Sequence, residues 1–163
     1  MTNPLFGRST PLEVGAEAPD VSALNHDGES VHFGELYKKG LVFVYFYPRA
    51  DTPGCTKQAC SLRDAYTDLS DRGVTVVGVS SDNPEAQKKF REKFNLPFTL
   101  MADSDHKIIE SFGVPTRLRK ASRQAFLIQD AKIVWRDLKA STAEQAADIL
   151  AALGCYEKRR LRG

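Results

Sequence analysis

Two of the three cysteines, Cys55 and Cys60, lie in one short segment that follows an apolar run ending at Pro48. The turn Thr52-Pro53-Gly54 is expected to start a helix, which places Cys55 near its first residue. Free backbone N–H groups and the positive end of the helix dipole stabilise an anion there, and the thiolate is the reactive form of cysteine. A cysteine in this place can also be a small, inert core side chain. The position favours a nucleophilic Cys55 and leaves the inert interpretation open.

The spacing of Cys55 and Cys60 limits what the two thiols can do together. Residues i and i+5 of an α-helix lie about 8.6 Å apart at Cα and about 140° apart around the axis. A disulfide tolerates a Cα separation of only about 7 Å. The thiols therefore cannot bond to each other while the helix is intact. Either Cys60 is a core residue, or the helix unwinds locally so that Cys60 reaches an oxidised Cys55.

Metal binding and dithiol exchange fit this pair less well. Two cysteines five positions apart on one helix cannot share an ion unless the helix unwinds, and His26, His32 and His106 form no ligand motif with them. The Cys-x-x-Cys spacing of a dithiol oxidoreductase is absent from the sequence. We therefore expect no metal site.

The elements that must position these thiols alternate between strands and helices. Residues 41–47 and 74–80 are continuous apolar runs, typical of strands buried on both faces of a sheet that helices cover. Asp27-Gly28 is a hairpin turn signal between two short strands. This order predicts one α/β domain over residues 1–163, with a mixed central sheet flanked by helices and an N-terminal hairpin. The predicted helices are 55–69, 84–94, 103–112 and 142–153, and the later strands are 98–101, 125–128 and 133–137.

The composition indicates an ordinary globular protein, with 42% hydrophobic and 27% charged residues. Residues 1–11 are expected to form a loose leader without signal-peptide architecture, and no apolar run approaches a membrane span. Three cysteines are too few for a disulfide framework, so we expect a cytoplasmic, reducing location. The net charge of +2 is concentrated in a basic tail, residues 155–163. The rest is nearly neutral, which argues against a nucleic-acid-binding surface.

The pattern Pro48-x-x-x-Thr52-x-x-Cys55 resembles the signature of peroxiredoxins. The longer string over residues 46–60 is similar to the bacterioferritin comigratory protein branch, also called peroxiredoxin Q. The similarity extends over residues 12–153 and includes the Gly-x-x-Ala-Pro-Asp sequence at 15–20. It implies a thioredoxin-like fold.

The resemblance also implies a role for each residue of the site. Cys55 corresponds to the peroxidatic cysteine, which attacks the O–O bond and becomes a sulfenic acid. Thr52 corresponds to the threonine whose hydroxyl binds thiolate and peroxide, and Pro48 to the proline that shields the site from water. Arg123 corresponds to a family arginine from a distant strand, which stabilises the thiolate and holds the substrate oxygens. Cys60 corresponds to the resolving cysteine of the branch that carries both thiols on one helix.

The implied activity is a thioredoxin-dependent, atypical 2-Cys peroxidase that reduces hydrogen peroxide and alkyl hydroperoxides without a metal, flavin or haem cofactor. A monomer is expected, because an intramolecular cysteine pair needs no partner chain. Cys155 is expected to be an exposed thiol without a resolving role. Two alternatives stay open: a peroxide sensor that passes its oxidation to a partner, and a non-catalytic binding module of thioredoxin fold.

Overall fold

The computed structural model describes residues 10–162, so most of the predicted leader lies outside the described part of the chain. Strand β3 (Leu41–Phe46) is buried at every position, as its continuous apolar sequence predicts. It pairs in parallel with β4 (Val74–Ser80) and antiparallel with β8 (Gln124–Gln129). The segment that leads to Cys55 therefore leaves from the middle of the sheet.

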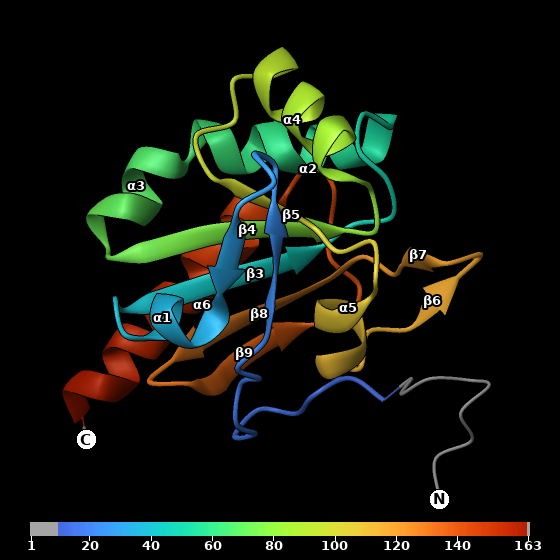
Figure 1. Ribbon diagram of the computed structural model, residues 1–163. Helices are drawn as coiled ribbons and strands as arrows, with labels where there is room; N and C mark the ends of the chain where they lie inside the picture. Colours follow the sequence, from blue (N-terminus) through green and yellow to red (C-terminus); the bar gives the residue numbers. More distant parts are fainter. Residues whose placement is uncertain (1–9, 163) are drawn as a thin grey trace, which may run out of the picture.

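The complete sheet has seven strands in the order β2-β1-β5-β4-β3-β8-β9 (Figure 1). Both ends of the sheet are antiparallel hairpins, which confirms the predicted mixed α/β sheet with an N-terminal hairpin. The remaining strands are β1 (Ser22–Asn25), β2 (Ser30–His32), β5 (Thr99–Ala102) and β9 (Lys132–Asp137), of which β2 and β9 form the edges.

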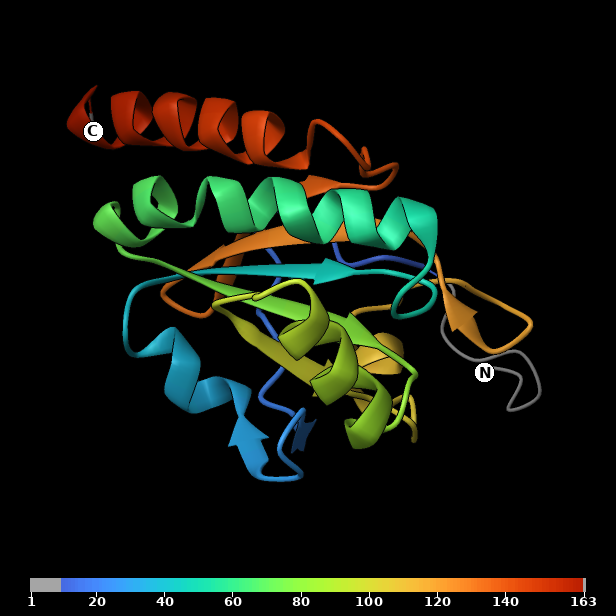
Figure 2. The same ribbon diagram turned by 90° about the horizontal axis from the view of Figure 1, so that it is seen from above.

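Helices cover the two faces of the sheet unequally (Figure 2). Four helices form a larger group on one face, where they cover the side chains of Phe43, Tyr45 and Tyr47. The alternate residues of β3 face the other side of the sheet, which two short helices cover. The larger group consists of α2 (Pro53–Asp64), α3 (Tyr66–Asp71), α4 (Pro84–Lys93) and α6 (Gln145–Arg162); the short helices are α1 (Phe33–Tyr37) and α5 (Lys107–Ser111).

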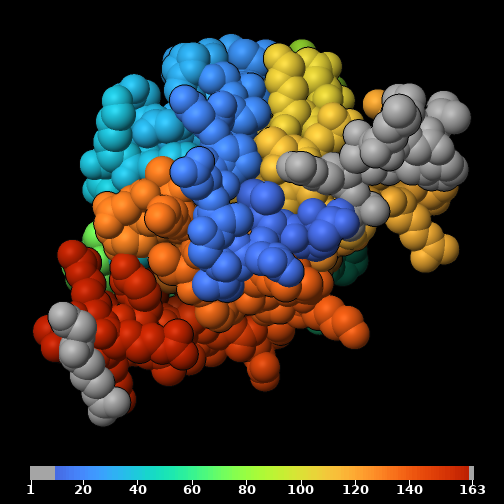
Figure 3. Space-filling view, turned by 90° about the horizontal axis from the view of Figure 1, so that it is seen from below, coloured from blue at the N-terminus to red at the C-terminus, as the bar shows by residue number. Residues whose placement is uncertain are grey.

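The described N-terminal segment crosses the face opposite the larger helices. In Figure 3 it runs (blue) between α5 (yellow) and the β8–β9 hairpin (orange). Its backbone bonds explain this course: the N–H of Leu12 donates to Phe112, and the N–H of Gly15 donates to Ile133. The segment thus links α5 to the edge strand β9.

The predicted helix 55–69 is wrong in both its start and its continuity. It begins at Pro53 and is interrupted at Ala65, whose ψ of 7° lies outside the helical range and separates α2 from α3. Gly73, with a φ of 77°, follows the end of α3 in the left-handed conformation that commonly terminates helices. The predicted helix 103–112 begins only at Lys107, because His106 has a left-handed backbone.

The predicted end of the last helix at residue 153 is also wrong, because α6 continues through the basic tail to Arg162. Gly154 does not stop it, since Tyr156 continues the apolar face of Leu153 and packs against the core. Lysine and arginine are good helix formers and suit the negative end of the helix dipole. No helix in the described part of the chain is long and apolar enough to cross a membrane.

A second, two-stranded sheet precedes β8 and was not predicted. It consists of β6 (Thr116–Arg117) and β7 (Lys120–Ala121). Its turn places Leu118 and Arg119 at φ values of 52° and 65°, where non-glycine residues are uncommon. This unusual turn chemistry explains why the sequence did not indicate a hairpin.

Candidate active site

Cys55 is the third residue of α2, and the loop of residues 47–52 joins this helix to the end of β3. Thr52 is the N-cap residue, with extended backbone angles, and Pro53 occupies the first helical position. The amide groups of this first turn have no partners within the helix, so the helix end favours negative charge. The Cys55 side chain is 1% exposed and packs in the core between α2 and the sheet. The fold therefore holds this thiol in a fixed, covered position at a helix N-terminus.

Arg123 reaches Cys55 because of the register between β3 and β8. Phe46, the last residue of β3, pairs with Gln124, the first residue of β8. Arg123 therefore lies at the sheet edge where the loop to α2 begins. Its Nη2 lies 3.5 Å from the Cys55 Sγ, within donor distance of the sulfur. The structure thus brings together two residues that are 68 positions apart.

A buried glutamine, Gln58, holds the other arm of Arg123. Arg123 Nη1 donates to Gln58 Oε1 at 2.6 Å, and Gln58 Nε2 donates to Gln145 Oε1 at 2.7 Å. Both glutamine side chains are fully buried. Neither glutamine was predicted from the sequence; the available signal was Gln58 as a polar residue on the core-facing side of α2, between Cys55 and Cys60. The guanidinium is oriented by two acceptors, one sulfur and one oxygen.

Thr52 and Pro48 lie in the loop that enters α2. The Thr52 hydroxyl donates to the Arg49 carbonyl oxygen at 2.8 Å and makes no helix-cap bond. A hydroxyl that donates its proton keeps lone pairs that can accept. Pro48 follows the buried Tyr47, one residue beyond the end of β3, and is half-buried. Both residues therefore lie in the loop between β3 and α2, within seven positions of Cys55 in the sequence.

The same loop contacts both ends of α4, through Asp82 just before the helix and Lys93 at its last position. The Asp82 carboxylate accepts the Ala50 N–H at 2.7 Å and the Ser80 hydroxyl at 2.6 Å. Asp51, with a φ of 58°, forms an ion pair with Lys93 at 2.9 Å. These contacts fix the backbone immediately before Thr52 and were not indicated by the sequence.

Two stacked tyrosines form the floor beneath α2, with Tyr45 and Tyr47 ring centroids 5.4 Å apart. Burial raises the pKa of Tyr47, whose hydroxyl donates to Gln87 at 2.6 Å. Burial also raises the pKa of Tyr45 well above its usual value, with smaller contributions from Tyr47 and Cys55. Both phenols therefore stay neutral near the thiol.

The remaining thiols lie on helices. Cys60 is half-buried, further along α2, and Cys155 is exposed on α6 rather than beyond the last helix. All three cysteines are free in this structure. Among residues 10–162, no group of three or more histidine, cysteine or acidic side chains is arranged to hold a metal ion.

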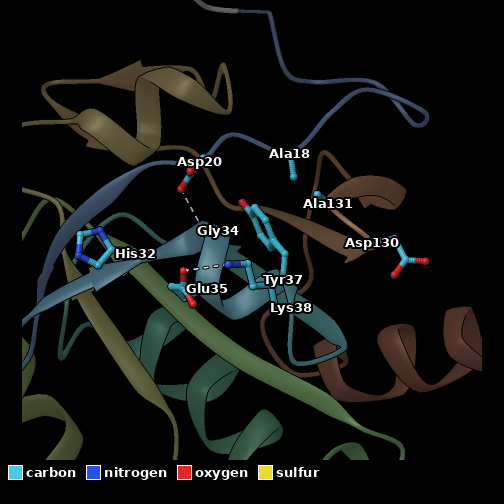
Figure 4. Close-up of a pocket in the computed structure, with 9 residues that line it drawn as sticks. All are labelled: Ala18, Asp20, His32, Gly34, Glu35, Tyr37, Lys38, Asp130 and Ala131. Carbon is cyan, nitrogen blue, oxygen red and sulfur yellow. Dashed lines mark hydrogen bonds and ion pairs between the residues drawn. The ribbon is translucent and has the colours of Figure 1, made fainter.

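A hollow in the surface lies elsewhere, beside α1, and has a volume of about 680 Å³. Figure 4 shows the residues that line it. Its charged groups are partly paired, with Lys38 Nζ 3.1 Å from Glu35, and the Gly34 N–H donates to Asp20. No cysteine lines it. This hollow therefore contains none of the thiols, and Cys55 with its neighbours remains the candidate site.

Comparisons with known proteins identify the family of this chain. The AhpC/TSA family profile matches residues 14–136. The chain is 49% identical to peroxiredoxin Bcp of Escherichia coli K12 over 104 residues, covering 64% of this chain and 66% of that protein. It is 37% identical to peroxiredoxin Bcp of Bacillus subtilis 168 over 139 residues, covering 78% and 87% of the two chains.

The fold is also similar to that of a solved structure. The crystal structure of peroxidoxin BcpB from Mycobacterium tuberculosis matches with a TM-score of 0.83, at 29% identity, over 88% of this chain and 97% of that one. This match confirms the thioredoxin-like fold expected from the signature around Cys55. The chain belongs to the AhpC/TSA family of peroxiredoxins, in its Bcp/peroxiredoxin Q branch of thiol peroxidases.

Proposed function

We propose that Cys55 is the peroxidatic cysteine of a thioredoxin-dependent peroxidase that acts on hydrogen peroxide and alkyl hydroperoxides. The observation that carries this proposal is the contact of the Cys55 Sγ with Arg123 at 3.5 Å, at the N-terminus of α2. A guanidinium and a helix N-terminus both stabilise the thiolate and the negative charge that moves to oxygen as the O–O bond breaks.

In the first step, the Cys55 thiolate attacks the terminal peroxide oxygen. The S–O bond forms, the O–O bond breaks, and the leaving oxygen takes the electron pair and a proton to become water or alcohol. Arg123 is placed to hold the substrate oxygens. Thr52 contributes its hydroxyl oxygen as an acceptor for the peroxide O–H, since its own proton is donated to Arg49. Pro48 limits the access of water.

In the second step, the Cys60 sulfur attacks the sulfenic sulfur, and a disulfide forms with release of water. Cys60 is five residues from Cys55 on α2, about 8.6 Å away at Cα by helix geometry. The N-terminal part of α2 must therefore unwind for this step. A dithiol reductant, for which we propose thioredoxin, then restores both thiols by exchange. A reducing compartment such as the bacterial cytoplasm supplies such a reductant.

Because the cysteine pair lies in one chain, we propose that the protein works as a monomer within a single domain. The test is thioredoxin-coupled peroxide consumption by Cys55→Ser. We expect no turnover, with retained fold by circular dichroism. Full turnover by this variant would refute the proposal. A wild-type protein that oxidises once and is not recycled by any dithiol would instead support the peroxide-sensor alternative.

A further inference from the structure

The contact between Gln58 and Gln145 joins the candidate active site to the start of α6. We propose that Gln145 is a positioning residue for Arg123, acting through the Gln58 side chain. This inference rests on the proposed role of Cys55 as the reacting thiol. It gives α6 a part in the chemistry, although α6 contributes no residue that touches Cys55 in the site described above.

The two hydrogen bonds that link Gln145 through Gln58 to Arg123 are called the relay below. The relay has a fixed direction because arginine can only donate hydrogen bonds. The Gln58 atom that faces Arg123 must therefore be the carbonyl oxygen Oε1, 2.6 Å from Nη1. The Gln58 amide nitrogen then points away, toward α6, and needs an acceptor. Gln145 Oε1 supplies it at 2.7 Å. Gln145 thus selects the one amide orientation of Gln58 in which an acceptor faces Arg123.

Burial makes this selection effective. Gln58 and Gln145 are both 0% exposed, so solvent is not available to replace a lost partner. If residue 145 had no acceptor, the Gln58 amide nitrogen would be buried without a partner, which is costly. Rotating that amide would not help, because the amide nitrogen would then face the guanidinium, which is also a donor. Either outcome moves Arg123 away from its position beside the Cys55 sulfur.

The relay also opposes the unwinding of α2. Gln58 lies between Cys55 and Cys60, so the segment that must unwind carries the middle of the relay. Helices α2 and α6 lie side by side (Figure 2), and the Ala146 N–H donates to the Ser61 hydroxyl at 3.3 Å. Unwinding breaks the link to α6 and the link to Arg123 together. The relay therefore favours the folded form in which Cys55 meets peroxide.

One buried atom shows how the relay can be tested. Gln145 Nε2 is buried and has no hydrogen-bond partner in the described part of the chain. The amide nitrogen of Gln145 is thus not needed for the relay, whereas its carbonyl oxygen is. Glutamate at this position keeps the acceptor, and methionine keeps the length but removes it.

The experiment measures Cys55 oxidation in a Cys60→Ser background, where the sulfenic acid persists. Protein is mixed with hydrogen peroxide, quenched with dimedone over time, and weighed as the intact chain. We expect Gln145→Met to lower the second-order rate about tenfold, the loss that follows from one buried hydrogen bond. We expect Gln145→Glu to stay within about threefold of the parent because the acceptor is retained. In chains with Cys60 intact, Gln145→Met should also form the disulfide faster after oxidation.

Ile149→Val is the matched control, because Ile149 is buried one turn further along α6 and is not part of the relay. It loosens packing without touching Gln58, so oxidation should remain at the parent rate. A Gln145→Met rate equal to the parent, or an equal loss in Ile149→Val, would overturn the relay. Failure of the parent to form any dimedone adduct at Cys55 would overturn the proposed function itself.

Discussion

Replacement of Arg123 tests the electrostatic argument at the site. Arg123→Met removes the charge and both donated bonds while keeping much of the aliphatic stem. Arg123→Lys keeps the charge but presents it on one nitrogen, which cannot form the fork that joins Gln58 and Cys55. The two variants therefore separate the effect of charge from that of geometry.

The expected magnitude follows from the 3.5 Å distance between Arg123 Nη2 and the Cys55 sulfur. At an effective dielectric constant of about 20, two unit charges at this distance attract by about 5 kcal/mol. Arg123 is only half-buried, and solvent reduces this energy. Hydrogen bonds to charged groups contribute about 1.5–3 kcal/mol, equivalent to about 10- to 150-fold in rate. We expect a loss in this range for Arg123→Met and a smaller loss for Arg123→Lys.

The assay is the second-order rate of Cys55 oxidation by hydrogen peroxide, measured by quench and intact mass in the Cys60→Ser background. Arg136→Met is the matched control, because Arg136 is another half-buried arginine and, among residues 10–162, it donates to the backbone carbonyls of Pro11 and Leu12 and not to the site. It should react at the parent rate. An Arg123→Met variant that also reacts at the parent rate would refute the electrostatic argument.

Three further predictions concern other parts of the chain. Gly54→Ala should slow Cys55 oxidation, because a Cβ there would lie 3.1 Å from Arg123 Nη2 and 3.3 Å from Thr142 Cγ2, so that these neighbours must shift; an oxidation rate equal to that of the parent would contradict this. Cys60→Ser should react once with peroxide but lose thioredoxin-coupled turnover, and sustained turnover would exclude Cys60 as the resolving residue. Burial, with Arg91 nearby, lowers the pKa of His26 below its usual 6.5; the unfolded chain then binds the extra proton first, so stability is lost as pH falls below about 6.5. Urea unfolding should show His26→Gln losing less stability than wild type as the pH falls below about 6.5.

The central strands could be predicted because they consist of consecutive apolar residues, the pattern of a strand that is buried on both faces. Residues 41–46 are apolar without alternation, and all six are buried between two layers of helices. A helix beginning close to Cys55 could also be predicted from the turn Thr52-Pro53-Gly54, although its first residue is Pro53 and not Cys55. These local signals were enough to place Cys55 at the end of a helix.

Long-range contacts could not be predicted from local patterns. Arg123 reaches Cys55 only through the pairing register of β3 and β8, and the sequence pointed to it through family resemblance alone. Gln58 and Gln145 are polar residues in buried positions, where a pattern-based interpretation expects apolar side chains. The end of α6 was misplaced because Gly154 is a helix-stop signal that tertiary packing of Tyr156 overrides.

The most direct test of the account is intact mass and peptide mapping after one equivalent of hydrogen peroxide. The account predicts loss of two hydrogens from a monomeric chain and a disulfide that joins the peptides of Cys55 and Cys60. The third thiol, Cys155, should remain free. A disulfide that involves Cys155, or a disulfide-linked dimer, would contradict the central claim that α2 unwinds to bring its own two cysteines together.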